Sequence, residues 1–133
     1  VAKLTIENVD GNHVIQDLGD GTWAMYAHMQ KGSLTVKPGD KVTKGQVIGK
    51  LGNTGNSNAP HLHFQLMNGP ELAGSDGLPY MFDAYDYAGY VDPAAIRAAD
   101  DFLTGEFFAH HLAKPLARTD QLPLNESLVN FGG

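Results

Sequence analysis

HVIQDLGDGTWAMYAH, residues 13–28, is the stretch that points most clearly to the fold. Two runs suited to β-strands, 13–18 and 22–28, flank the sequence GDG, whose glycines accept the backbone angles of a tight hairpin. Further strand-like runs, separated by glycine-rich turns, lie at residues 4–8, 33–36, 46–51 and 61–67. No long helical periodicity occurs before residue 90, so the sequence predicts a mainly β, antiparallel domain.

The composition narrows the class of protein. With 133 residues the chain is long enough for one domain with a hydrophobic core. Its formal net charge is −6 and its nine basic residues are scattered, so we expect no nucleic-acid partner. The absence of cysteine excludes disulfides and thiolate metal sites. No apolar run approaches the roughly 18 residues of a membrane-spanning helix, so we expect no transmembrane segment.

The later part of the chain has a different pattern. Residues 69–89 contain many aromatics and predict a long irregular excursion. Asp92 and Pro93 form a typical helix start, an N-cap followed by proline at the first helical position, and apolar residues then recur at helical spacing up to Gly105. Residues 122–131 predict a final strand.

Residues 59–66 read APHLHFQL and place two histidines one residue apart in a strand-like run. Side chains alternate between the two faces of a strand. The apolar face, which we expect to build the sheet, then consists of Leu62, Phe64 and Leu66. The polar face, which we expect to line a groove, consists of His61, His63 and Gln65. The same alternation in residues 22–28 places His28 on a face with Ala24 and Tyr26.

Histidines in this pattern permit two interpretations. Neutral imidazole is the commonest protein ligand of zinc, and imidazole is also the usual general base near neutral pH. A His-x-His pair on a strand is more often a solvated polar face than a site. The pattern alone therefore favours the solvated face, and the surrounding sequence has to decide.

That surrounding sequence resembles a known family. Residues 11–67 contain, in order, a GN-x-V strand, the triplet YAH ending at His28, the turn VKPGDKVTKGQVIG, the loop GNTGNS and the run PHLHF at 60–64. Their order and spacing are similar to the core of the lysostaphin/LytM-type metalloendopeptidases, which cut peptide bonds in bacterial peptidoglycan.

The resemblance implies a mainly β fold. We expect an antiparallel sheet, open-barrel or sandwich-like, with one short C-terminal helix and a final strand. The expected organisation is a single LytM-type domain over residues 1–133 with its core at about 4–67. The excursion, helix and last strand of 69–133 are atypical of the family, and the sequence does not reveal their role.

The resemblance also implies roles for three histidines. The second histidine of His-x-His, His63, is expected to bind zinc. His61 is expected to face the metal-bound water, and His28 to stand beside it. Zinc lowers the pKa of its bound water to about 7 and polarises the peptide carbonyl. One imidazole then takes the proton of the water and the other stabilises the oxyanion, and the sequence leaves open which does which.

A catalytic zinc usually takes three protein ligands, and the family draws the other two from an upstream His-x-x-x-Asp motif. Only ten residues precede Gly11, so we expect this chain to be the C-terminal part of a longer protein whose upstream segment completes the site. His13 and Asp17 spell the same motif, but they lie in the strand that forms the hairpin. We interpret them as surface residues of that strand rather than as metal ligands.

Two weaker sets of candidate residues occur in the later part of the chain. His110 and His111 are adjacent, so their side chains point in different directions, and we interpret them as surface residues near a helix end. The aromatic set consists of Tyr80, Phe82, Tyr85, Tyr87 and Tyr90. These aromatics could line a substrate groove, but we favour packing of the excursion onto the sheet.

Two functional hypotheses follow. The first is a zinc-dependent metalloendopeptidase domain that hydrolyses the peptides of peptidoglycan, in the bacterial cell envelope or after secretion, with this chain inactive by itself. The second is a catalytically inactive LytM-like module that binds cell walls or regulates their hydrolysis. Three retained histidines favour the first hypothesis, and the sequence does not identify the cleaved bond.

Overall fold

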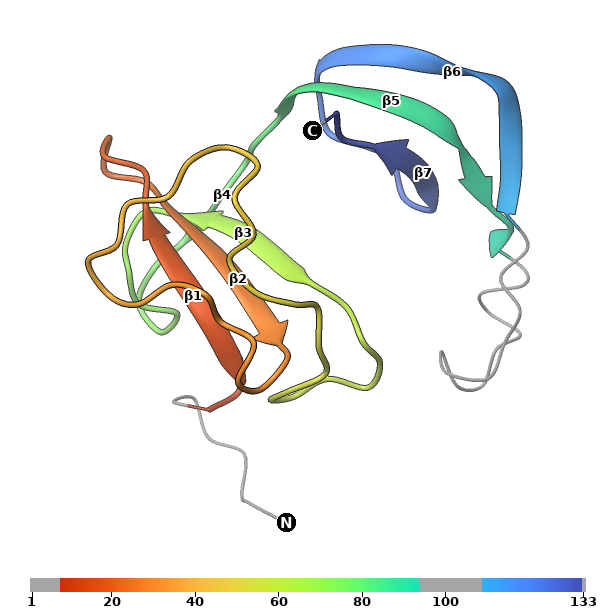
Figure 1. Cartoon of the computed structure of the whole chain (residues 1–133). Coiled ribbons are helices and arrows are strands. Elements are labelled where there is room, and N and C mark those ends of the chain that lie inside the picture. The colour runs from red at the N-terminus through yellow and green to blue at the C-terminus, as the bar shows by residue number, and fades with distance from the viewer. Residues whose placement is uncertain (1–7, 94–108, 133) are drawn as a thin grey trace. The chain divides into compact units, whose positions relative to one another are not determined.

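The computed structural model describes residues 8–93 and 109–132 (Figure 1). The chain divides into two compact units, Val1–Pro79 and Tyr80–Gly133, and each is described by itself. Antiparallel strands dominate both units, which confirms the mainly β fold expected from the sequence. The single domain expected over the whole chain stays a prediction.

The first unit contains a four-stranded antiparallel sheet with the order β1-β2-β3-β4 (Figure 1). Its strands are β1 (Asn12–Asp17), β2 (Trp23–Met29), β3 (His63–Met67) and β4 (Gly77–Leu78). The predicted hairpin is confirmed, because β1 pairs with β2 and Leu18 donates its backbone N–H to the carbonyl of Thr22 at 3.1 Å. Gly19 and Gly21 have φ angles of 86° and 85°, a region that favours glycine.

The long segment between β2 and β3 contains two runs that were predicted as strands, 33–36 and 46–51. These two predictions are wrong, because neither run is a strand in the structure. The runs still lie side by side, since Thr35 donates its N–H to the carbonyl of Ile48 at 3.1 Å. The Thr35 hydroxyl also donates to the carbonyl of Val47, so a side chain takes up an acceptor that a regular ladder would use.

The hydrophobic core of the first unit lies on one face of the sheet. Its most buried members are Met25, Ala27 and Met67. The partly buried side chains packed against them are Ile15, Trp23 and Leu72. Ala27 pairs with His63 across β2 and β3, and directly opposed side chains point to the same face. The core therefore shares its face with His63.

This arrangement corrects the assignment of the apolar face of β3. The sequence indicated that the face of Leu62, Phe64 and Leu66 would build the sheet. The core instead lies on the opposite face of β3, the face of His63 and Met67. Leu62 remains 46% exposed. Phe64 packs against Tyr26 on this second face, with 5.2 Å between the ring centroids. Both faces of the sheet thus carry apolar side chains, and alternation alone did not show which face is the better covered.

The second unit is a three-stranded antiparallel sheet with the order β6-β5-β7. Its strands are β5 (Phe82–Val91), β6 (Ala109–Gln121) and β7 (Ser127–Asn130). The irregular excursion predicted for 69–89 is wrong at β4, in the first unit, and again from Phe82 onward, where the aromatic residues favour a strand. The sequence reasoning also missed β6. The final strand predicted for 122–131 is confirmed over the shorter range of β7.

Aromatic side chains of the second unit pack around Phe131, the residue that follows β7. The rings of Phe82 and Tyr85 lie 4.7 Å and 6.1 Å from the Phe131 ring, measured between centroids. Tyr80 contacts Phe82 at a centroid distance of 5.7 Å. These aromatics therefore pack on one another within the second unit. The sequence had favoured packing of an irregular excursion onto the sheet, and it had not indicated Phe131 as the partner.

Two predictions fall mainly outside the described residues. The strand expected at 4–8 lies largely in the range 1–7, and the helix expected after Asp92 lies in the range 94–108. Within the part of the chain that the structure describes, no helix has the length and the hydropathy needed to cross a bilayer.

Candidate functional site

His28 lies in an irregular part of β2. The pairing of β1 with β2 passes from Val14 opposite Tyr26 to Asn12 opposite Met29, so two residues of β2 oppose a single residue of β1. This is a β-bulge. Within it His28 has a φ of 61°, a left-handed conformation that few non-glycine residues adopt.

The bulge determines the face of the sheet to which the His28 side chain points. In a regular strand His28 would point to the face opposite that of its neighbour Ala27. Ala27 pairs with His63, so strict alternation would place His28 and His63 on opposite faces of the sheet. In the structure the His28 ring centroid lies 5.8 Å from that of His63 and 4.7 Å from that of His61. The bulge therefore brings the three predicted histidines together.

Both the backbone and the ring of His28 are held by hydrogen bonds. Its backbone N–H donates to the carbonyl of Asp10 at 2.9 Å, and its ring Nδ1 donates to the carbonyl of Thr54 at 2.8 Å. Because a carbonyl can only accept, the proton of the neutral ring is on Nδ1 and the lone pair is on Nε2. The side chain is buried, 6% exposed. A buried polar residue with a strained backbone is typical of a functional site.

Thr54 ties the loop before β3 to the bulge. Its hydroxyl accepts the backbone N–H of Asn12 at 2.9 Å and donates to the carbonyl of Met29 at 2.8 Å, so it bridges β1 and β2. Its own carbonyl accepts the ring N–H of His28. One residue thus stabilises the bulge and orients the imidazole. The sequence reasoning did not assign this role, and its only signal was the position of Thr54 within the GNTGNS loop.

Two glycines allow this loop to approach β1 closely. Gly11 and Gly55 have φ angles of 63° and 78°. A Cβ atom on Gly55 would overlap the backbone of Gly11 and of Val9, and a Cβ on Gly11 would overlap Thr54. The contact that positions Thr54 therefore requires glycine at both positions, for space as well as for conformation.

His61 stands just before β3 and is exposed. Its backbone N–H donates to the carbonyl of Gly52 at 3.2 Å. Its ring Nδ1 lies 2.8 Å from the carbonyl of Ala59 and 3.2 Å from the hydroxyl oxygen of Ser57. The ring donates from Nδ1 to that carbonyl, so His61, like His28, presents Nε2 as its accepting nitrogen.

His63 presents the opposite nitrogen. Its ring Nε2 lies 2.9 Å from Oε1 of the Gln65 side chain. The amide oxygen accepts, so the proton of the neutral ring is on Nε2 and the lone pair is on Nδ1. The His63 side chain is exposed at the first residue of β3. A metal ion could reach Nδ1 from solvent.

The donor set fits part of a zinc site. Imidazole nitrogen is a good zinc ligand, and His63 offers one such nitrogen. The Nε2 atoms of His28 and His61 suit proton transfer with a water beside it. Within residues 8–93 and 109–132, however, no group of three or more His, Cys, Asp or Glu side chains could hold a metal ion. The described residues therefore bring three imidazoles together without forming a complete metal site.

The other histidines have separate surroundings. His13 hydrogen bonds to a backbone carbonyl at 3.0 Å, and Asp17 accepts a turn N–H at 2.8 Å. Both contacts are local and exposed, in keeping with their interpretation as surface residues. His110 and His111 are exposed on β6, where His110 stacks on Tyr90 with 4.7 Å between ring centroids.

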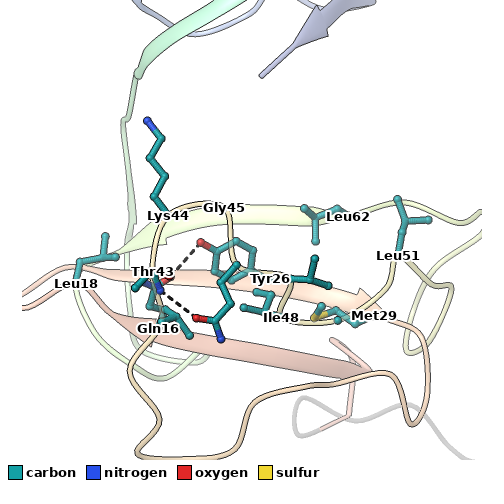
Figure 2. Close-up of a pocket in the computed structure, with 14 residues that line it drawn as sticks. Gln16, Leu18, Tyr26, Met29, Thr43, Lys44, Gly45, Ile48, Leu51 and Leu62 are labelled. Atoms are coloured by element: carbon teal, nitrogen blue, oxygen red, sulfur yellow. Dashed lines mark hydrogen bonds between the residues drawn. The ribbon is translucent and has the colours of Figure 1, made fainter. Parts of the chain in front are cut away.

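A cavity of about 670 Å³ lies on the opposite, Tyr26 face of the first sheet, against residues 42–49 (Figure 2). Tyr26 donates its hydroxyl to Oε1 of Gln16 at 3.1 Å there. Burial raises the pKa of Tyr26, which therefore stays a neutral donor at physiological pH. The rest of the lining is mostly apolar and includes none of the three histidines, so the cavity is separate from the histidine cluster.

Comparison with known proteins shows the family of the chain. Residues 1–74 match peptidase family M23. Peptidoglycan DD-endopeptidase ShyA of Vibrio cholerae is 44% identical over 57 residues, which are 43% of this chain and 13% of ShyA. Lysostaphin of Staphylococcus simulans is 45% identical over 67 residues, 48% of this chain and 13% of lysostaphin. Endolysin 2638A of Staphylococcus phage 2638A is 44% identical over 62 residues, 44% of this chain and 13% of the endolysin.

The matched stretch thus spans about an eighth of the length of each of these relatives. No solved structure gives a significant match. The resemblance noted in the sequence is confirmed by the family match, which includes all three clustered histidines. Since this match covers 74 of the 133 residues, the chain belongs to peptidase family M23.

Proposed function

We propose that this chain is part of a zinc-dependent endopeptidase that hydrolyses peptide bonds of bacterial peptidoglycan. The observation that carries the proposal is the convergence of His28, His61 and His63, which a bulge at a strained residue brings to one face. One of the relatives supports the substrate class, since ShyA is named a peptidoglycan DD-endopeptidase. Such an enzyme acts in the cell envelope or after secretion.

In this proposal His63 holds the metal through Nδ1, the nitrogen that its hydrogen bond leaves unprotonated. Zinc supplies a Lewis acid that polarises the peptide carbonyl and acidifies a water. His28 and His61 present Nε2 toward proton transfer. In its neutral form either ring can accept the proton of the attacking water, and in its protonated form either ring can donate to the developing oxyanion.

We propose that the remaining zinc ligands come from a segment that precedes this chain in the full protein and carries the family's His-x-x-x-Asp motif. The described residues contain no group of three or more side chains that could hold a metal ion, so the chain by itself is expected to bind zinc weakly and to hydrolyse nothing. Submicromolar, stoichiometric zinc binding by the 133-residue chain would contradict this division of the site.

The test is hydrolysis of purified peptidoglycan by the full protein, with and without a chelator. We expect turnover that the chelator abolishes and added zinc restores. His63→Ala should remove both zinc binding and turnover. His28→Ala should remove turnover and retain zinc binding. His110→Ala, on the exposed surface of β6, is the matched control and should behave as the unmodified protein. Turnover that survives both the chelator and His63→Ala would refute the proposal.

A second candidate function has one observation in its favour. Because the described residues hold no complete metal group, the full protein could be an inactive module that binds or regulates cell-wall hydrolases. That module would bind peptidoglycan without cleaving it, and His63→Ala would leave its binding unchanged. Hydrolysis of peptidoglycan by the full protein, and the effect of His63→Ala, therefore distinguish the two functions.

A further inference from the structure

The three clustered histidines do not present the same ring nitrogen. His28 and His61 donate from Nδ1 to backbone carbonyls, so the fold of the chain fixes their tautomers. His63 donates from Nε2 to the side chain of Gln65. The acceptor that sets the tautomer of His63 is therefore the only one of the three that a substitution can remove without moving the backbone.

Gln65 is well placed to act as a fixed acceptor. It lies two residues after His63 on β3, so both side chains point to the same face of the strand. Across the sheet it pairs with Met25, which is fully buried. Gln65 itself is half-buried. Its place opposite a buried residue limits the positions of its amide, which lies 2.9 Å from the ring nitrogen.

We propose that Gln65 is a positioning residue of the site, whose amide oxygen keeps the neutral His63 ring protonated at Nε2 and so leaves Nδ1 to bind the metal. The assignment rests on the proposed function for the role of Nδ1, but the effect on the ring exists without metal. Groups that accept from the second nitrogen of a ligating imidazole fix its tautomer and orientation, and their loss usually weakens metal binding.

Two substitutions at Gln65 separate positioning from packing. Gln65→Met keeps the length of the side chain and removes the acceptor. Gln65→Glu restores an acceptor at the same place, and its charge strengthens the hydrogen bond. Gln16→Met is the matched control, because Gln16 accepts from the Tyr26 hydroxyl on the other face of the sheet. Gln16→Met therefore makes the same chemical change as Gln65→Met, but on the face of the sheet away from the histidines.

The measurement is the pair of ring ¹⁵N chemical shifts of His63 in the metal-free 133-residue chain, at about pH 8.5, where an imidazole is ordinarily neutral. We expect a single tautomer protonated at Nε2 in the unmodified chain, in Gln65→Glu and in Gln16→Met. Gln65→Met should show the intermediate shifts of two exchanging tautomers. Unchanged His63 shifts in Gln65→Met, or a proton on Nδ1 in the unmodified chain, would overturn the proposal.

Zinc affinity of the full protein gives a second readout. Gln65→Met should lower the affinity for Zn²⁺ about 10- to 100-fold, and Gln65→Glu should recover it. Equal affinity in all three proteins would contradict the role of Gln65. Failure of the proposed function would look different, since peptidoglycan would then stay intact with the unmodified full protein while the His63 shifts still responded to Gln65→Met.

Discussion

The loop at Gly55 lies in close contact with the start of β1, and this contact positions Thr54 against the bulge and the ring of His28. The perturbation that tests it is Gly55→Ala, because a methyl group there would overlap the backbone of Gly11 and of Val9. Gly45→Ala is the matched control. Gly45 has a φ of 81°, nearly the 78° of Gly55, and a Cβ on Gly45 would meet no atom within 4 Å.

The expected loss in the free energy of unfolding has two parts, the cost of alanine at a left-handed φ and the cost of steric overlap. Alanine at a left-handed φ costs about 1–2 kcal/mol in either variant. Overpacking adds about 1–3 kcal/mol, and the upper part of that range applies at Gly55 because the atoms that would have to move are backbone. We expect Gly45→Ala to lower the free energy of unfolding by about 1 kcal/mol and Gly55→Ala to lower it by about 3 kcal/mol or more.

The assay is urea unfolding of the 133-residue chain, followed by the fluorescence of Trp23. This residue is the only tryptophan in the chain, and it packs against the buried core of the first unit. A lower midpoint with an unchanged slope reports a loss of stability. Equal midpoints for Gly55→Ala and Gly45→Ala would refute the reasoning, because the two variants share the conformational cost and differ only in the overlap.

Two further predictions use the same unfolding measurement. Thr54→Val should lower the free energy of unfolding by about 1–3 kcal/mol, because it removes the hydroxyl that accepts the backbone N–H of Asn12 and donates to the carbonyl of Met29, both partly buried. Thr35→Val, which removes an exposed hydroxyl, should cost no more than about 0.5 kcal/mol, and a similar loss in both variants would contradict the role of Thr54. Burial raises the pKa of Tyr26 above its ordinary 10.0, so its folded form binds the proton more tightly than the unfolded form. This contribution to stability is full below pH 10.0 and is lost as the pH rises through the folded pKa. Above pH 10.0, Tyr26→Phe should therefore lose less of its free energy of unfolding than the unmodified chain. Identical dependence of the free energy of unfolding on pH in the two proteins would exclude the burial of Tyr26 as the cause.

The local signals in the sequence predicted the first hairpin but not every strand. The hairpin within 13–28 formed as expected, because its turn glycines and its alternating strands depend only on neighbouring residues. The runs 33–36 and 46–51 do not form strands, because side-chain hydroxyl groups there hydrogen bond to backbone groups that a regular sheet would pair with each other. The strand β5 was missed because its aromatic residues were taken for an irregular segment.

The candidate site was predicted through family resemblance and not through periodicity. Alternation applied to β2 and β3 would have put His28 and His63 on opposite faces of the sheet. What unites them is the bulge, which Thr54 holds from 26 residues further along the chain. Such a contact between distant segments leaves no periodic trace in the sequence. Gln65 was assigned to the correct face, but its effect on the ring nitrogen of His63 required coordinates.

The central claim is that the bulge turns His28 onto the face of His63. The most direct measurement is the set of nuclear Overhauser contacts from the ring protons of His28 in the 133-residue chain. We expect contacts to the ring protons of both His61 and His63, whose ring centroids lie 4.7 Å and 5.8 Å from that of His28. Contacts to Phe64 or Leu66, on the other face of β3, in place of these would contradict it.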